Sequence, residues 1–207
     1  MFNEDSRVKI PAILHLCRLG YTYIPKSKQD RLEENNIFPD IFKRSISRIN
    51  PQISEEEIQR LLTDVSLKLN YDDLGREFFR SLVNTSGTKL IDFENFNNNE
   101  FHVTTELTCK KGDEEFRPDI TVLINGMPLV FIEVKKPNNR EGVIAERNRI
   151  NKRFALKDFR AFTNVTQLML FSNNMEYEDG VIEPIMGAYY ATPSKDSVMF
   201  NYFREEE

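Results

Sequence analysis

The sequence predicts an α/β fold of the α+β kind, in which a mostly helical N-terminal part precedes a core of strands and helix. Apolar residues recur at helical spacing through residues 1–90, whereas residues 100–192 contain short apolar runs that are rich in Val, Ile and Thr and typical of strands. A chain of 207 residues with 40% hydrophobic content can bury one sizeable core. We therefore expect a single domain, residues 1–207, with an N-terminal helical layer.

The N-terminal part carries signals for four helices. The first is an apolar stripe at spacings of three and four residues that stops near Gly20, and its members are Ile10, Ile13, Leu14 and Cys17. A strand over Tyr21–Ile24 and a short helix over Ile41–Ile49 fit the mixed pattern that follows. Ser54 and Glu57 form a capping box, which predicts a helix that starts at Ser54. A further helix should carry the apolar residues Leu74, Phe78 and Leu82.

The second part reads as a sheet with one long helix. Three strands are predicted over Phe101–Lys110, Asp119–Ile124 and Leu129–Val134. The last two are joined by the tight-turn pair Asn125-Gly126, so we expect a meander. A helix over Glu141–Phe162 and two short strands, Gln167–Phe171 and Gly187–Ala191, complete the prediction.

Composition limits the environment of the protein. The start lacks the basic and apolar pattern of an export signal, and no stretch approaches the roughly 20 apolar residues of a membrane span. The two cysteines, Cys17 and Cys109, are too few for a disulfide framework, and Cys109 suits a small core residue. We therefore expect a cytoplasmic protein without a membrane partner.

Two carboxylates and a lysine fall where the central hairpin should bring them together. Asp119 opens one strand and Glu133 closes the next, within apolar runs where a carboxylate needs a partner or a metal ion. Lys135 lies on the same side of its strand as Glu133, because side chains alternate with a period of two. With the backbone carbonyl of Val134, these oxygens would suit Mg²⁺, and Lys135 could steer an attacking water. The alternative is a turn cap at Asp119 and an exposed pair of Glu133 with Lys135.

These residues resemble a known family of nucleases. Arg117-Pro118-Asp119 followed by Glu133-Val134-Lys135 matches the PD-(D/E)-x-K motif. The surrounding segment, FRPDITVLINGMPLVFIEVKKP, is similar to the N-terminal nuclease domain of the motor (R) subunit of type I restriction enzymes. The resemblance extends to NEDSRVKIPAILHLCRLGYTYIP, LIDFENFNNNEFHV and LMLFSNNMEY, and so covers most of the chain.

The resemblance implies a restriction-endonuclease-like core with a mixed central sheet flanked by helices. It also implies cleavage of double-stranded DNA with Mg²⁺, or alternatively Mn²⁺, in a complex with modification and specificity subunits. In that family a helicase motor follows in the same polypeptide and uses ATP. No G-x-x-x-x-G-K-S/T loop occurs in these 207 residues, so we expect ATP to bind only to such a downstream motor.

Site residues carry over from the resemblance one at a time. Asp119 and Glu133 correspond to the metal-binding acids, and Lys135 to the catalytic lysine. Glu4 would match the acid that this nuclease superfamily often supplies from its first helix, although it also suits a helix start, where the dipole favours an acid. The family's Gln-x-x-x-Tyr pattern is absent from the following helix, which carries charged side chains instead.

Charge is unevenly distributed along the chain. The total is -5, which argues against tight binding of DNA by general electrostatics. Lys136, Arg149 and Arg153 belong to a strongly basic stretch beside the predicted site, and we expect them to contact phosphates. The alternative is a surface ion pair of Glu146 with Arg149. Two other functions also remain open: a docking or DNA-positioning module without catalysis, and a stand-alone nuclease.

Overall fold

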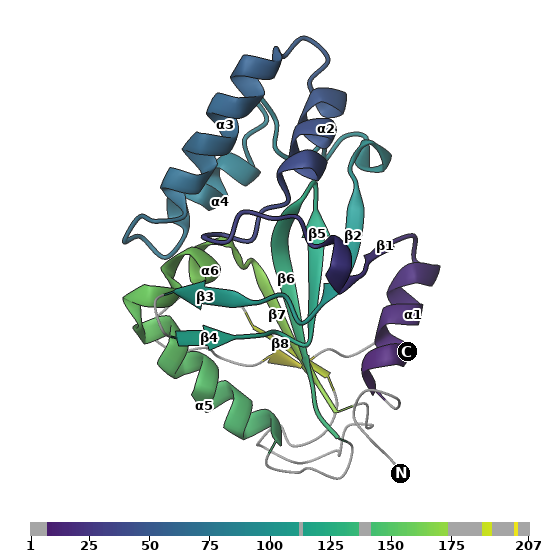
Figure 1. Ribbon diagram of the computed structural model, residues 1–207, viewed down its shortest axis with the longest axis vertical. Coiled ribbons are helices and arrows are strands. Elements are labelled where there is room, and N and C mark those ends of the chain that lie inside the picture. Colours follow the sequence, from purple (N-terminus) through teal and green to yellow (C-terminus); the bar gives the residue numbers. More distant parts are fainter. Residues whose placement is uncertain (1–7, 112–113, 137–141, 174–187, 192–200, 203–207) are drawn as a thin grey trace.

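The computed structural model describes residues 8–111, 114–136, 142–173, 188–191 and 201–202 of the chain (Figure 1). Within these ranges, seven strands form one sheet in the order β1-β2-β5-β6-β7-β8-β9, and β3 and β4 form a separate two-stranded sheet. The strands are β1 (Thr22–Ile24), β2 (Phe101–Thr105), β3 (Cys109–Lys111), β4 (Glu114–Phe116), β5 (Ile120–Ile124), β6 (Met127–Val134), β7 (Leu168–Ser172), β8 (Ala188–Ala191) and β9 (Asn201–Tyr202).

The helices fall into an N-terminal group and a group after β6. They are α1 (Ile10–Arg18), α2 (Pro39–Ile49), α3 (Glu55–Lys68), α4 (Arg76–Leu82), α5 (Gly142–Ala155) and α6 (Arg160–Val165), with short 3₁₀ turns at η2 (Lys26–Lys28), η3 (Phe96–Asn98) and η4 (Lys157–Phe159). No helix in the described ranges is long and apolar enough to cross a membrane.

The sheet is mixed, as expected. The strands β2, β5 and β6 form the predicted antiparallel meander. β1 runs parallel to β2, and β7 runs parallel to β6. The predicted fold class, a mixed sheet flanked by helices with an N-terminal helical layer, is confirmed.

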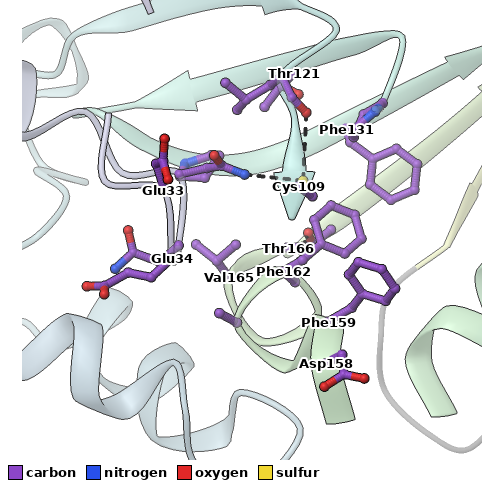
Figure 2. A pocket seen from close by; sticks show the side chains of 16 residues that line it. Glu33, Glu34, Cys109, Thr121, Phe131, Asp158, Phe159, Phe162, Val165 and Thr166 are labelled. Atoms are coloured by element: carbon purple, nitrogen blue, oxygen red, sulfur yellow. Dashed lines mark hydrogen bonds between the residues drawn. The ribbon is translucent and has the colours of Figure 1, made fainter. Parts of the chain in front are cut away.

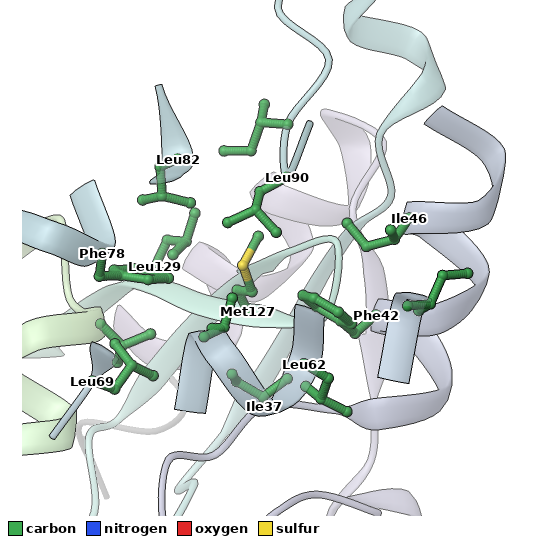
Figure 3. Close-up of a cluster of buried hydrophobic side chains, with 14 of the residues drawn as sticks. Ile37, Phe42, Ile46, Leu62, Leu69, Phe78, Leu82, Leu90, Met127 and Leu129 are labelled. Atoms are coloured by element: carbon green, nitrogen blue, oxygen red, sulfur yellow. The ribbon is translucent and has the colours of Figure 1, made fainter. Parts of the chain in front are cut away.

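The helical layer made by α2, α3 and α4 packs on the turn end of the β5–β6 hairpin (Figures 1 and 3). Ser54 starts α3 through the predicted capping box, in which its hydroxyl accepts the Glu57 N–H and the Glu57 carboxylate accepts the Ser54 N–H. Met127 and Leu129 from β6 are buried among side chains of this layer. The other labelled members in Figure 3 are Ile37, Phe42, Ile46, Leu62, Leu69, Phe78, Leu82 and Leu90.

The two faces of the sheet have different covers. α1 contributes partly buried Ile13 and Leu16 to a cluster with Ile120 and Val134, so it lies on one face. On the opposite face, Phe131 packs against Phe162 of α6, with ring centroids 5.4 Å apart. The predicted active side chains belong to this second face, because Glu133 is two residues from Phe131 on the same strand.

Three details of the predicted elements are wrong. The strand over Phe101–Lys110 is broken at Glu106, whose φ of 50° belongs to the left-handed region and ends the extended run. The helix over Glu141–Phe162 is interrupted at Leu156, which adopts an extended conformation between α5 and η4. The predicted stripe of the first helix is largely exposed, since Ile10 and Leu14 are 50% and 57% accessible and Cys17 is also exposed.

Candidate active site

A β-bulge in the central hairpin aligns the two motif acids. Near the Asn125-Gly126 turn, Leu123 pairs with Pro128, but beyond the bulge Val122 pairs with Val130. This shift of one residue carries on to the pair Ile120 and Ile132, so Asp119 comes opposite Glu133. Residues that lie opposite each other in an antiparallel pair point to the same face. If the same sequence paired regularly, without the bulge, Asp119 would lie opposite Ile132, and its side chain would be on the other face from Glu133.

The Asp119 carboxylate is tied directly to the second strand. Its Oδ2 accepts a hydrogen bond from the Val134 N–H at 2.9 Å. The backbone carbonyl of Asp119 accepts the Glu106 N–H at 3.2 Å, at the point where β2 ends. The structure therefore places Asp119, Glu133 and Val134 together, as the motif predicts.

Glu133 and Lys135 form a close pair at the end of β6. The Lys135 Nζ donates to Glu133 Oε1 at 2.7 Å, and the two side chains are only 15% and 9% exposed. The alternative of an exposed pair is therefore wrong. Burial, together with the charges of Glu146 and Asp119, raises the pKa of Glu133 to about 7. Burial alone would lower the pKa of Lys135, but the Glu133 carboxylate and the neighbouring acids raise it above its ordinary value.

Glu146 of α5 is a third acid at this site, and the sequence did not single it out as one. Its side chain is 1% exposed, and its Oε2 lies 3.6 Å from the Lys135 Nζ. Arg149 and Arg153 surround the same carboxylate, at 2.9 Å and 3.6 Å. The ion pair of Glu146 with Arg149 thus exists, but its acid is buried and not on the surface as the alternative supposed. The sequence placed Glu146 on a helix among basic residues, but this pattern is also typical of an exposed helix face. It therefore could not indicate that Glu146 is buried at the site.

The three predicted phosphate-binding residues differ in accessibility. Lys136 is exposed, and the Arg149 side chain is 56% exposed. Arg153 is only 17% exposed, and its guanidinium carbon lies 4.2 Å from the ring centre of Phe116 in β4. Lys136 and Arg149 therefore present their charge to solvent, whereas Arg153 is mainly held inside.

A lysine also approaches the site from the start of α1. The Lys9 Nζ lies 2.9 Å from Glu106 Oε1 and 3.9 Å from Asp119 Oδ1. Hydrogen bonds from Lys26 and Lys9 lower the pKa of Glu106 to about 2. Lys9 was not predicted as a site residue. Glu4, which was, lies outside the described residues.

The donor set of the site suits a hard divalent cation. Within the described ranges, no three His, Cys, Asp or Glu side chains converge closely enough to hold a metal ion by themselves. Asp119 and Glu133 nevertheless offer carboxylate oxygens on one face at one end of the hairpin, and Glu133 is largely buried there. A cation placed between these acids would stabilise the buried carboxylates, so the residues fit an oxygen-bound ion such as Mg²⁺.

A separate apolar pocket lies next to this site. Figure 2 shows Cys109 between Phe131, Phe159 and Phe162 on one side and Glu33 on the other. Cys109 is buried, as expected of a core residue, and burial raises the pKa of its thiol to about 12. A thiol of this kind is a poor nucleophile. None of the motif residues Asp119, Glu133 and Lys135 lines the pocket, so it is not the candidate site.

Comparisons with known proteins point to restriction enzymes. A candidate endonuclease subunit of the type I restriction enzyme MjaIXP from Methanocaldococcus jannaschii is 28% identical over 203 residues, covering 86% of this chain and 19% of that protein. The endonuclease subunit of SauMSSORF170P from Staphylococcus aureus is 30% identical over 156 residues, covering 75% and 15%. The HindI subunit of Haemophilus influenzae is 23% identical over 165 residues, covering 70% and 15%.

The chain therefore spans a fifth or less of the length of these relatives. The family described as the type I restriction enzyme R protein N terminus matches residues 1–178, which include every motif residue above. The match takes in both the helical layer and the central hairpin. This chain belongs to the family of type I restriction enzyme R protein N-terminal domains.

Proposed function

We propose that this chain is the Mg²⁺-dependent endonuclease domain of a type I restriction enzyme R subunit and hydrolyses phosphodiester bonds of double-stranded DNA. The observation that carries the proposal is the gathering of Asp119, Glu133 and Lys135 at one end of the β5–β6 hairpin. Relatives named as endonuclease subunits of type I enzymes support the choice of reaction.

Each site residue has a role that follows from its contacts. Asp119 and Glu133, with the Val134 carbonyl, would hold the cation, and Mn²⁺ could replace Mg²⁺. When bound, the cation supplies a polarised phosphoryl oxygen and a water of lowered pKa. Lys135 carries its positive charge beside Glu133, where it can orient an attacking water or offset negative charge on the phosphate. The Val134 N–H holds Asp119 in place.

DNA would contact the exposed basic residues beside the site. Other subunits and the rest of the full-length polypeptide would help this domain to bind DNA. Lys136 and Arg149 expose positive charge next to the site and would contact phosphates. The net charge of -5 opposes tight binding of DNA by this chain alone. Modification and specificity subunits, and an ATP-driven motor in the full-length subunit, would supply affinity and choice of site.

Single substitutions test the catalytic assignment. Asp119→Ala, Glu133→Ala and Lys135→Ala should each lower Mg²⁺-dependent cleavage of duplex DNA by at least about a hundredfold, since each removes a charge needed in the transition state. Glu56→Ala, which removes an exposed acid paired with Arg60, is the control and should cleave as the wild type does. Cleavage at the wild-type rate by any of the three site variants would refute the role assigned to that residue.

One observation favours a second function, a docking or DNA-positioning module without catalysis. Lys135 contacts Glu133 directly, and no ready cluster of three metal-binding side chains exists in the described residues. Calorimetry with Mg²⁺ and Mn²⁺ separates the two functions. A nuclease domain should bind the ion and lose it in Glu133→Gln, whereas a docking module need not bind it.

A further inference from the structure

The Glu146 side chain occupies a position that a surface ion pair would not require. It is 1% exposed, and neither of its carboxylate oxygens accepts a hydrogen bond from a described residue. Among the described residues, its ion-pair partners are Lys135, Arg149 and Arg153. Burying a carboxylate without hydrogen bonds is unfavourable, and a Glu on the solvent side of α5 could pair with Arg149 equally well. The burial therefore calls for a role beyond the pair with Arg149.

The third partner, Lys135, supplies that role. Its ammonium lies between two acids from different elements, 2.7 Å from Glu133 on β6 and 3.6 Å from Glu146 on α5. In the proposed nuclease, Glu133 also binds a divalent cation. That cation would draw on the Glu133 charge and repel the ammonium, so Glu133 alone would hold Lys135 less well. Glu146 does not bind the cation in this arrangement, so its negative charge can still attract the Lys135 ammonium.

We propose that Glu146 is a positioning residue that keeps the Lys135 ammonium in the site when Glu133 binds the catalytic cation. The inference rests on the proposed nuclease function and deepens it. Arg149 and Arg153 hold the Glu146 carboxylate from the side of α5, and Arg153 is in turn fixed against the Phe116 ring. The acid is thereby anchored at the helix and presented to Lys135.

Charge removal without change of shape tests this role. Glu146→Gln should lower the rate of duplex cleavage at saturating Mg²⁺ by tenfold or more and leave the dissociation constant of Mg²⁺, measured by calorimetry, within about twofold of the wild type. The matched control is Glu77→Gln, because Glu77 and Arg80 form an i,i+3 pair on α4 that resembles Glu146 and Arg149 on α5. Glu77→Gln should change neither quantity.

A measurement on the lysine itself distinguishes positioning from general support of the fold. Side-chain NMR of the Lys135 ammonium, assigned by its loss in Lys135→Arg, reports its mobility with and without Mg²⁺. In the wild type the ammonium should stay ordered when Mg²⁺ is added, whereas in Glu146→Gln it should become mobile. If Glu146→Gln does not fold, Glu146→Asp can replace it in the test. Asp keeps the negative charge but is one methylene shorter, so the carboxylate lies farther from Lys135 and the same effects should appear more weakly.

The possible outcomes separate the two proposals. A wild-type chain that neither binds Mg²⁺ nor cleaves DNA, at high chain concentration and low ionic strength, overturns the nuclease function and the role of Glu146 with it. A wild-type chain that does both, beside a Glu146 variant that cleaves at the same rate with an ordered Lys135, overturns the positioning role alone.

Discussion

Glu133 carries its charge in an unfavourable place, because it is buried and faces two other acids, Asp119 and Glu146. Its pKa of about 7 lies above the ordinary 4.5. Between these two pH values the folded chain therefore keeps a proton on Glu133, whereas the unfolded chain has released it. The stability from this group is complete below about pH 4.5 and is lost as the pH rises towards 7.

Replacing Glu133 by the neutral Gln should therefore flatten the pH dependence of stability. Without metal, the wild type should lose stability between about pH 5 and pH 8, whereas Glu133→Gln should not lose this contribution. The free energy of unfolding of the variant minus that of the wild type should therefore rise by on the order of 2 to 3 kcal/mol over this range. Urea denaturation in the presence of a chelator measures the difference. Parallel pH curves for the two proteins would contradict the assigned burial of charge.

Glu100 provides a control of opposite sign. The hydrogen bonds that it accepts from Arg44 lower the pKa of Glu100, so its stabilising effect is present above the ordinary carboxyl pKa and is lost as the pH falls below it. The stability difference between the wild type and Glu100→Gln should therefore shrink as the pH falls below about 4.5.

At the level of single residues, the sequence identified the acids and the lysine of the motif but not their surroundings. Asp119, Glu133 and Lys135 could be found because they interrupt apolar strand runs, where a charge is conspicuous. Glu146 and Lys9 lie at helical positions among other charged residues. Periodicity assigns such residues to a solvated face, and only the packing of α5 and α1 on the sheet shows that they turn inward.

At the level of elements, the hairpin turn is the point that fixes the site. Asn125 and Gly126 have φ values of 51° and 79°, and the buried Asn125 amide donates to the Leu90 carbonyl. A Cβ on Gly126 would lie 2.7 Å from both the Phe38 carbonyl oxygen and the Phe42 nitrogen. The turn therefore needs glycine both for its conformation and for the close approach of the helical layer.

Gly126→Ala should accordingly destabilise the protein by about 3 kcal/mol or more, since conformational strain of roughly 1 kcal/mol adds to a backbone clash. The control is Gly87→Ala, because Gly87 has a similar φ of 82° but open space around its Cβ position. It should cost only about 1 kcal/mol. Equal losses in thermal or urea denaturation would show that the approach of the helical layer is unimportant.

Local signals predicted most elements, and tertiary contacts explain the rest. The capping box at Ser54 and the Asn125-Gly126 turn are short-range patterns, and both are confirmed. The break at Glu106 has no glycine or proline to announce it, and its left-handed backbone is accompanied by ion pairs with Lys9 and Lys26. The direction of β7 was equally hidden, because a short apolar run looks the same in a parallel and an antiparallel pair.

At the level of the whole molecule, the distribution of charge governs contact with DNA. We expect the isolated chain to bind duplex DNA only weakly at physiological salt, because its net charge is -5. Lys136→Gln and Arg149→Gln should each weaken binding and reduce the slope of log affinity against log salt by roughly one.

Arg153→Gln should behave differently, because that guanidinium is held between Glu146 and Phe116. It should lower the free energy of unfolding and leave the salt slope almost unchanged. Fluorescence anisotropy at several salt concentrations gives the slopes. Nanomolar binding by the isolated chain at physiological salt would contradict the expected dependence on partner subunits.

The bulge between Val122 and Leu123 also constrains how this hairpin can change during evolution. Inserting or deleting one residue in a regular hairpin would turn Glu133 and Lys135 away from Asp119. If one residue is deleted at the bulge and the hairpin then pairs regularly, Asp119 again lies opposite Glu133. Homologues should therefore differ by a single residue between the two halves of the motif only where the bulge appears or disappears with it, and a length change there can be read as a change of strand geometry.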